Sequence, residues 1–237
     1  PVCSSAASDV YKRQALALAQ KEGFAEPDPT FDISGQDAAQ KTSILATLSF
    51  FQNSSMEKVY FEGIHKISPD DIDYGKQLNF VLKPLSVGMQ NKDQITLGSF
   101  PAFVKTDSLL ASIQNENNAV LVNAENVGGT MYSGPGAGAK PTANSVLSDV
   151  IDIARGKIFD YEKFVQQDLS SSFDNFSCDR YLKLQVNDKP GVVAKISTLL
   201  AKNNLSIDNL IQKELERSDD QIPLVIAVSY THLTLPT

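Results

Sequence analysis

The residues best suited to chemistry are an aspartate and a lysine spaced four apart, Asp37 and Lys41, in a segment reading DAAQKTSILATLSFF that favours a helix. A lysine can stabilise negative charge that develops on an oxygen, and a neighbouring carboxylate can orient it. At about 100° per residue, both charges share a sector of roughly 60° with Ile44 and Leu48. Because they continue an apolar stripe that should be buried, we expect them to face a cleft. The alternative is a solvated surface ion pair, which contributes about 0.3 to 0.5 kcal/mol.

An acidic turn comes directly before this segment. Residues 24–36, FAEPDPTFDISGQ, contain Glu26 and Asp32 together with two prolines and a glycine. This composition predicts irregular backbone, and Asp32 or Ser34 is available to cap the following helix. The turn therefore brings acidic side chains to the N-terminal end of the helix.

A glycine-rich segment is the next candidate. Residues 128–155 are predicted to form a glycine-rich loop that leads into a helix, and residues 134–139, GPGAGA, match the pattern G-x-G-x-x-A. A dinucleotide-binding fingerprint also needs a buried strand before it and a second strand with an acidic residue about 20 residues later, and no such second strand follows the helix here. A phosphate-binding Walker loop is excluded because Pro141 follows Lys140. The remaining structural alternative is that the glycines serve only a tight helix entry.

The two ends of the chain are expected to be artefact. Residues 4–14, SSAASDVYKRQ, can be back-translated into a transposon sequencing adapter, and residues 228–237, VSYTHLTLPT, into its reverse complement. Translated adapter has no evolved role in the fold. Between these ends stand one cysteine, Cys178, and one histidine, His65. These are too few for a disulfide or a Cys/His zinc site, so no metal site is expected.

Charge and hydropathy exclude further classes. The formal charge of −7 and the lack of a basic cluster argue against nucleic-acid binding. No run approaches the roughly 18 apolar residues of a membrane span, and a single thiol suits a reducing compartment. The sequence thus predicts a cytoplasmic protein that binds neither nucleic acid nor membrane.

The elements that must position these residues are predicted from apolar periodicity. Strands are expected near Val59, Asn79, Gln94 and Asn118, with a helix from Ser68. This mixture predicts an α/β or α+β domain with a mixed, largely antiparallel sheet. After a linker over residues 158–178, the order strand, helix, strand, strand predicts an incomplete ferredoxin-like βαββαβ domain whose third strand ends at Ala227.

The stretch AEPDPTFDISGQDAAQK resembles the substrate-binding signature of the homoserine dehydrogenase family. The resemblance implies that Glu26 and Asp32 bind the substrate and that Asp37 and Lys41 take part in catalysis. It also implies reversible hydride transfer between NADP or NAD and L-aspartate 4-semialdehyde, giving L-homoserine in threonine, methionine and isoleucine biosynthesis. Fixed acids suit the ammonium group of such a substrate, and a cation suits its carboxylate.

In that family a glycine-rich loop and a PTA segment return the chain to the nucleotide-binding domain, beside the cofactor. The residues here that resemble them are Gly134, Gly136, Gly138, Pro141 and Thr142. Pro135 stands where the family usually has arginine. The sequence DKPGVVAKIS, followed by NNLSIDNLIQ, is similar to the ACT domain, with Asp188, Pro190 and Gly191 at its ligand turn. This implies amino acid binding between two such domains of a homodimer or larger homo-oligomer, with L-threonine as the feedback effector in some members.

The resemblance gives the expected domain organisation. Its parts are adapter at 1–14, a substrate-binding and dimerisation domain at 15–157 of which 128–157 returns to the nucleotide-binding domain, the linker at 158–178, a truncated ACT domain at 179–227, and adapter at 228–237. An N-terminal Rossmann domain is missing, so this polypeptide alone is expected to be inactive. The alternative is a non-enzymatic amino-acid-binding regulator built on the ACT domain, which would not need the EPDP turn or the pair Asp37 and Lys41.

Overall fold

The computed structural model describes residues 14, 17–18, 20–21, 28–91, 94–115, 117–136, 138–157, 170–173, 176–212 and 221–230. The chain divides into two units, residues 1–72 with 79–175, and residues 73–78 with 176–237. Among the described residues, no helix is long and apolar enough to cross a membrane. Short elements that connect the main ones are η1 (Met56–Lys58), η2 (Ile64–Lys66), α4 (Pro69–Gln77) and η3 (Leu109–Ser112).

The first unit begins with two helices that meet at a glycine, α2 (Thr30–Ser34) and α3 (Gln36–Phe50). The expectation of irregular backbone over residues 24–36 is wrong for α2. Its prolines lie before the helix, where no backbone N–H is needed, and Pro29 occupies the N-cap position. The expected caps are also wrong, because Asp32 and Ser34 lie inside α2 and Gly35, with φ of +84°, caps α3.

A mixed sheet forms the centre of this unit. β2 (Phe80–Asn91) and β3 (Gln94–Lys105) form a long antiparallel hairpin, and two short strands, β1 (Tyr60–Phe61) and β6 (Ser170–Ser171), pair with β3 in parallel. β1 is opposite Gly98 and Ser99, whereas β6 is opposite Gln94 and Ile95. The predicted mixed, largely antiparallel sheet is confirmed. The expected linker over residues 158–178 is only partly right, because β6 belongs to the sheet.

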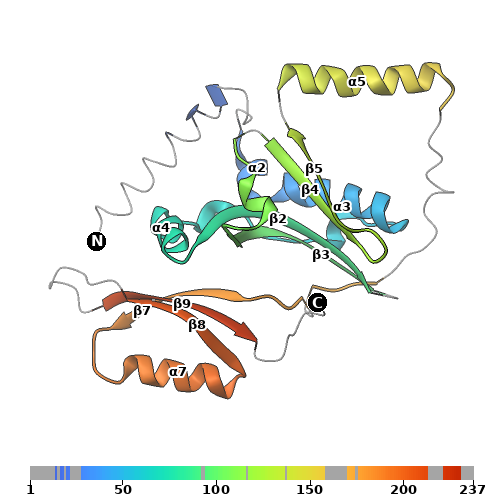
Figure 1. The fold of residues 1–237 in the computed structure, drawn as a ribbon. Coiled ribbons are helices and arrows are strands. Elements are labelled where there is room, and N and C mark those ends of the chain that lie inside the picture. Colours follow the sequence, from blue (N-terminus) through green and yellow to red (C-terminus); the bar gives the residue numbers. More distant parts are fainter. Residues whose placement is uncertain are drawn as a thin grey trace. The chain divides into compact units, whose positions relative to one another are not determined.

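Helix α3 packs on β2 and β3 (Figure 1) through small side chains. Ala39 and Ala46 are buried in a cluster with Val59, Ile95 and Leu97. Small residues on the inner face let the helix axis approach the strands closely. Phe50 also packs against this cluster, whereas Ile44, Leu45 and Leu48 are left on the outer face of the helix.

A second hairpin and a long helix complete the unit. β4 (Asn117–Ala124) and β5 (Gly128–Pro135) form a separate two-stranded antiparallel sheet, followed by α5 (Ala139–Ala154). The prediction that residues 128–155 are a loop leading into a helix is therefore wrong for its first part. The sequence GGTMYSGP supplies a full set of backbone partners for β4, so it forms a strand despite its glycines.

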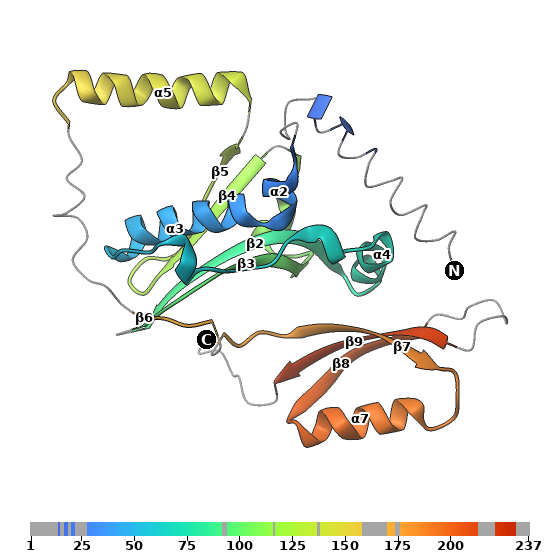
Figure 2. The same ribbon diagram turned by 180° about the vertical axis from the view of Figure 1, so that it is seen from behind.

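The described residues from 176 onward in the second unit form a three-stranded sheet covered by a helix (Figure 2). Its elements in chain order are β7 (Arg180–Asn187), α7 (Val192–Lys202), β8 (Leu205–Gln212) and β9 (Gln221–Tyr230), with β9 in the centre of the sheet. The helix packs onto Leu224, Ile226 and Val228 through Leu200 and half-buried neighbours. This confirms the predicted strand, helix, strand, strand order.

Strand β9 runs past the boundary expected at residue 227. Val228 is only 1% exposed and is paired with Arg180 and Ile207 on the two neighbouring strands. The adapter origin of residues 228–237 stays a prediction. Whatever their origin, the first three of these residues extend the central strand, and one is part of the core.

Candidate functional site

The predicted catalytic pair is in contact. Lys41 Nζ donates a hydrogen bond to Asp37 Oδ2 at 2.6 Å, and Asp37 lies in the first turn of α3. The Lys41 side chain is 63% exposed and that of Asp37 35% exposed. Electrostatic attraction between groups this exposed is screened by water and is weak as a source of stability. In this chain the lysine is therefore held by the aspartate but open to a binding partner on its other side.

The expectation that this pair continues a buried stripe is wrong. Ile44 is 59% exposed and Leu48 is 46% exposed, while the buried face of α3 carries Ala39, Thr42 and Ala46. The apolar stripe of Ile44 and Leu48 did not predict the buried face, because the helix packs on the sheet through its small residues. Asp37, Lys41, Ile44 and Leu48 share one face as predicted, but that face is open to solvent in this chain.

Phe51 ends this exposed face. It caps α3 in the left-handed conformation, with φ of +54° and its N–H donating to the Thr47 carbonyl. A bulky side chain is rare in this conformation, which favours glycine. Phe51 is 49% exposed. The outer face of α3 thus carries a row of apolar side chains that leads away from the charged pair.

Two glycines fix the corner between α2 and α3. A Cβ added to Gly63 would lie 2.2 Å from the Ile33 carbonyl oxygen, and one added to Gly35 would lie 3.1 Å from the Glu62 carbonyl oxygen. Only glycine lets the two backbones approach this closely. The loop after β1 therefore sits directly against the corner from which Asp37 projects.

The predicted substrate acids are only partly placed. Glu26 lies outside the described residues, whereas Asp32 is exposed on α2 and its carbonyl accepts the Gly35 N–H. Asp28, in the same EPDP turn, accepts hydrogen bonds from the hydroxyl of Thr30 at 2.6 Å and from its backbone N–H at 3.1 Å. The hydroxyl bond first, and the backbone bond second, lower the pKa of the Asp28 carboxyl. The turn thus carries a fixed negative charge just before α2.

The glycine-rich segment is divided between two elements. Gly134 lies in β5, whereas Gly136 and Gly138 lie between β5 and α5. A Cβ on Gly136 would lie 1.9 Å from Asn118 Nδ2, which is the end of an exposed side chain that can move aside. Pro141 and Thr142 occupy the first turn of α5, where the Thr142 hydroxyl donates to the Gly138 carbonyl at 2.9 Å.

The predicted ACT ligand turn is exposed. Asp188 and Pro190 lie between β7 and α7, and Gly191 caps α7 with φ of +89°. The Gly191 carbonyl accepts the Lys195 N–H at 3.0 Å. The turn is formed as expected, with a glycine where the backbone requires a positive φ.

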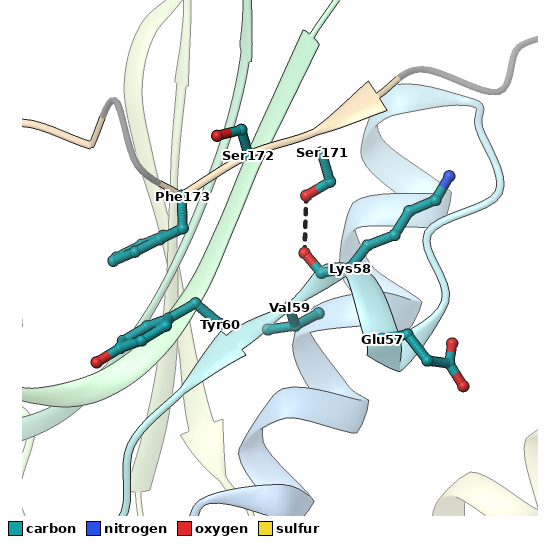
Figure 3. Close-up of a pocket in the computed structure, with 7 residues that line it drawn as sticks. All are labelled: Glu57, Lys58, Val59, Tyr60, Ser171, Ser172 and Phe173. Atoms are coloured by element: carbon teal, nitrogen blue, oxygen red, sulfur yellow. Dashed lines mark hydrogen bonds between the residues drawn. The ribbon is translucent and has the colours of Figure 1, made fainter.

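An open pocket of about 520 Å³ was not predicted (Figure 3). It is lined by Glu57, Lys58, Val59, Tyr60, Ser171, Ser172 and Phe173. A hydrogen bond from the Ser55 side chain, aided by the backbone N–H of Glu57, lowers the pKa of the Glu57 carboxyl. None of the predicted site residues lines this pocket. Sequence reasoning missed it because its two sides are more than 100 residues apart in the chain.

Among the residues that the structure describes, no group of three or more His, Cys, Asp or Glu side chains could hold a metal ion. Helices α2 and α3 offer one cation, Lys41, two carboxylates, Asp32 and Asp37, and an exposed apolar surface.

The first unit contains an α+β domain and the second contains a small sheet covered by one helix, and comparison with known proteins identifies the family of the chain. The family model described as homoserine dehydrogenase matches residues 4–151, and the ACT domain model matches residues 180–233. The chain belongs to the homoserine dehydrogenase family. The matched ranges include residues 4–14 and 228–233, whose adapter origin remains a prediction.

Several relatives show the extent of the similarity. The homoserine dehydrogenase of Pseudomonas aeruginosa is 38% identical over 221 residues, covering 89% of this chain and 51% of the relative. That of Neisseria gonorrhoeae is 40% identical over 219 residues, covering 88% and 49%. The crystal structure of a homoserine dehydrogenase from Thiobacillus denitrificans superimposes with a TM-score of 0.80 at 32% identity, covering 91% of this chain and 51% of that one. The chain therefore spans about half the length of the relatives it matches.

Proposed function

We propose that this chain supplies the substrate-binding half of an enzyme that interconverts L-aspartate 4-semialdehyde and L-homoserine with NADP or NAD. The observation that carries the proposal is the contact between Lys41 and Asp37 in the first turn of α3. It lies in a chain of the homoserine dehydrogenase family, beside an acidic turn. The nucleotide-binding half is needed for activity, because no described segment forms a nucleotide-binding fold.

Each site residue has a chemical role in this proposal. Lys41 stabilises the negative charge that develops on the aldehyde oxygen during reduction, and Asp37 orients the lysine. Glu26 and Asp32 bind the ammonium group of the amino acid. When bound, the nicotinamide cofactor would supply or accept the hydride at the carbon that bears this aldehyde oxygen.

The glycine-rich segment fits a position beside that cofactor. Gly134, Gly136 and Gly138 carry no side chain that would block close approach, and Pro141 and Thr142 lie in the first turn of a helix, whose free N–H groups favour anions. Their role would be to line one side of the cofactor. No described segment of this chain forms a domain that would bind the cofactor.

Two exposed apolar faces support docking of the missing half. On α5, Val146, Leu147, Val150 and Ile151 recur at helical spacing, and each is more than a third exposed. On α3, Ile44 and Leu48 are exposed next to Lys41. Covering these faces would remove a large apolar area from water, and covering α3 would narrow the space around the catalytic lysine.

The experiment joins this chain to the nucleotide-binding half of a relative and measures turnover of L-aspartate 4-semialdehyde. Replacing Lys41 by alanine should lower kcat by a factor of about 10² to 10³, as loss of a charge-stabilising donor does. Glu26→Gln should raise KM more than it lowers kcat, because it contacts substrate in the ground state as well.

Lys76→Ala is the matched control. Lys76 forms a similar helix ion pair with Asp73 at 3.1 Å, with both side chains more than 60% exposed. Its loss should leave kcat and KM unchanged. A Lys41→Ala enzyme as active as the Lys76→Ala control would show that the Asp37 pair is only a surface contact.

We also propose that the Asp188 to Gly191 turn binds an amino acid effector, with L-threonine as the candidate. The turn is exposed in this chain, and Gly191 gives it a conformation that other residues adopt only with strain. One turn offers few contacts to a small ligand. Binding therefore requires the turn of a second ACT domain, as in a homodimer.

A further inference from the structure

The segment after α5 returns to the sheet and is fastened there. β6 pairs with β3, the Ser172 N–H donates to the Ile95 carbonyl at 3.2 Å, and the Ser171 hydroxyl donates to the Lys58 carbonyl at 2.7 Å (Figure 3). The described residues of this segment are 170–173, and Phe173 is the last of them.

Phe173 is held by aromatic side chains and by a glycine. Its ring stacks on Tyr60 with centroids 4.4 Å apart and planes 7° apart, and it meets Phe100 edge to face at 5.6 Å. A Cβ on Gly98 would lie 2.4 Å from the Phe173 ring. The bare backbone of β3 therefore provides a seat that fits this ring.

Tyr60 leads directly to the candidate catalytic corner. It lies in β1 opposite Gly98, and two residues later the Glu62 N–H donates to the Ser99 carbonyl at 2.8 Å. Glu62 and Gly63 then pack against Gly35 and the end of α2. A short, continuous series of close contacts thus joins Phe173 to the start of α3.

We propose that Phe173 is a positioning residue for the pair Asp37 and Lys41, acting through Tyr60, the Glu62–Gly63 loop and Gly35. The stacked ring fixes β1 on the edge of β3, and the loop after β1 fixes the corner between α2 and α3. Because Gly35 and Gly63 leave no spare room at this corner, a shift of β1 moves α3 with it. The catalytic role of the pair rests on the proposed function, whereas the mechanical connection does not.

The connection is tested first in this chain by hydrogen exchange. Phe173→Ala should increase exchange on the order of tenfold at the amides of Glu62 and Ala39, which report the β1 edge and the first turn of α3. Amides of β7 and β9 in the second unit should not change. Phe80→Ala is the control, because Phe80 also packs edge to face on a ring, that of Phe103, elsewhere in the same sheet. It should leave the amides of Glu62 and Ala39 unchanged.

The kinetic test uses the enzyme completed with a nucleotide-binding half. Phe173→Ala should lower kcat about tenfold, as small displacements of a catalytic group do, and Phe173→Tyr should restore it by keeping the stacked ring. In a Lys41→Ala background the same change should lower kcat less than about twofold, because the group that Phe173 positions is gone.

The outcomes distinguish a failure of the positioning role of Phe173 from a failure of the proposed function. Unchanged exchange at Glu62 and Ala39, or an equal loss of kcat in both backgrounds, would overturn the positioning role. An inactive completed enzyme with increased exchange at these amides would overturn the proposed function and leave the connection standing. If Phe173→Ala does not fold, Phe173→Leu keeps apolar volume without the stacked ring and gives the same comparison.

Discussion

Helices α7 and α5 both have an apolar face, but the face of α7 is packed in a core and the face of α5 is exposed. Both carry apolar residues at helical spacing, and in α7 these residues pack on Leu224, Ile226 and Val228 of their own sheet. In α5 no residue is buried, and Ile153 is 71% exposed. The same pattern therefore belongs to a completed core in one unit and to an uncovered surface in the other.

The different exposure of α5 and α7 shows what an apolar stripe on a helix does and does not predict. Periodicity shows that a helix face needs a partner, but not that the partner lies in the same chain. The outer face of α3 is also apolar without a partner among the described residues, because Ile44 and Leu48 are exposed on the same face as Lys41. This chain spans about half the length of the relatives it matches, and we propose that the remaining half supplies the cover.

The largest expected effect tests this contrast directly. Leu224→Ala should destabilise the second unit by about 2 to 5 kcal/mol, because Leu224 is fully buried and truncation leaves a cavity. The matched change in α5, Leu147→Ala, should alter stability by less than about 0.5 kcal/mol, since Leu147 is 57% exposed. Urea denaturation followed at amides of each unit measures both. A costly Leu147→Ala would mean that α5 is covered within this chain.

A smaller effect is expected at the end of the central strand. Val228→Ala should cost about 1 to 3 kcal/mol, since Val228 is 1% exposed in the core under α7. Ser229→Ala, one residue later in β9 and half-buried, is the control and should cost less than about 1 kcal/mol. The same denaturation experiment on the second unit decides. Equal midpoints for Val228→Ala and the unmodified chain would show that residues from 228 onward do not contribute to the fold.

The smallest effect concerns the uncovered face of α3. Phe51→Gly should stabilise this chain by about 0.5 to 1 kcal/mol, because glycine accepts the left-handed conformation that strains a bulky residue. In the completed enzyme the gain should shrink or reverse if the ring is covered by the second half. Thermal unfolding of both forms measures the change. A loss of stability in this chain alone would show that the Phe51 ring is already packed here.

The sequence by itself determined the local features. Turn residues and apolar periodicity predicted most of the strands and helices, and the EPDP turn with Asp37 and Lys41 predicted the family. The contact of Lys41 with Asp37 at 2.6 Å is a feature of the same local kind. These features depend on neighbours within a few residues, so the chain carries them locally. Gly128 to Pro135 shows the limit, because a glycine-rich segment became strand β5 only through pairing with β4.

Only the tertiary structure decided which faces are covered and which distant segments meet. Ala39 and Ala46, rather than Ile44 and Leu48, became the inner face of α3, because close packing on the sheet favours small side chains. The corner at Gly35 forms only where the loop that carries Gly63 packs against it. The stacking of Phe173 on Tyr60 brings together two residues that are more than 100 positions apart in the chain. No pattern along the chain specifies such contacts, because they result from packing in three dimensions.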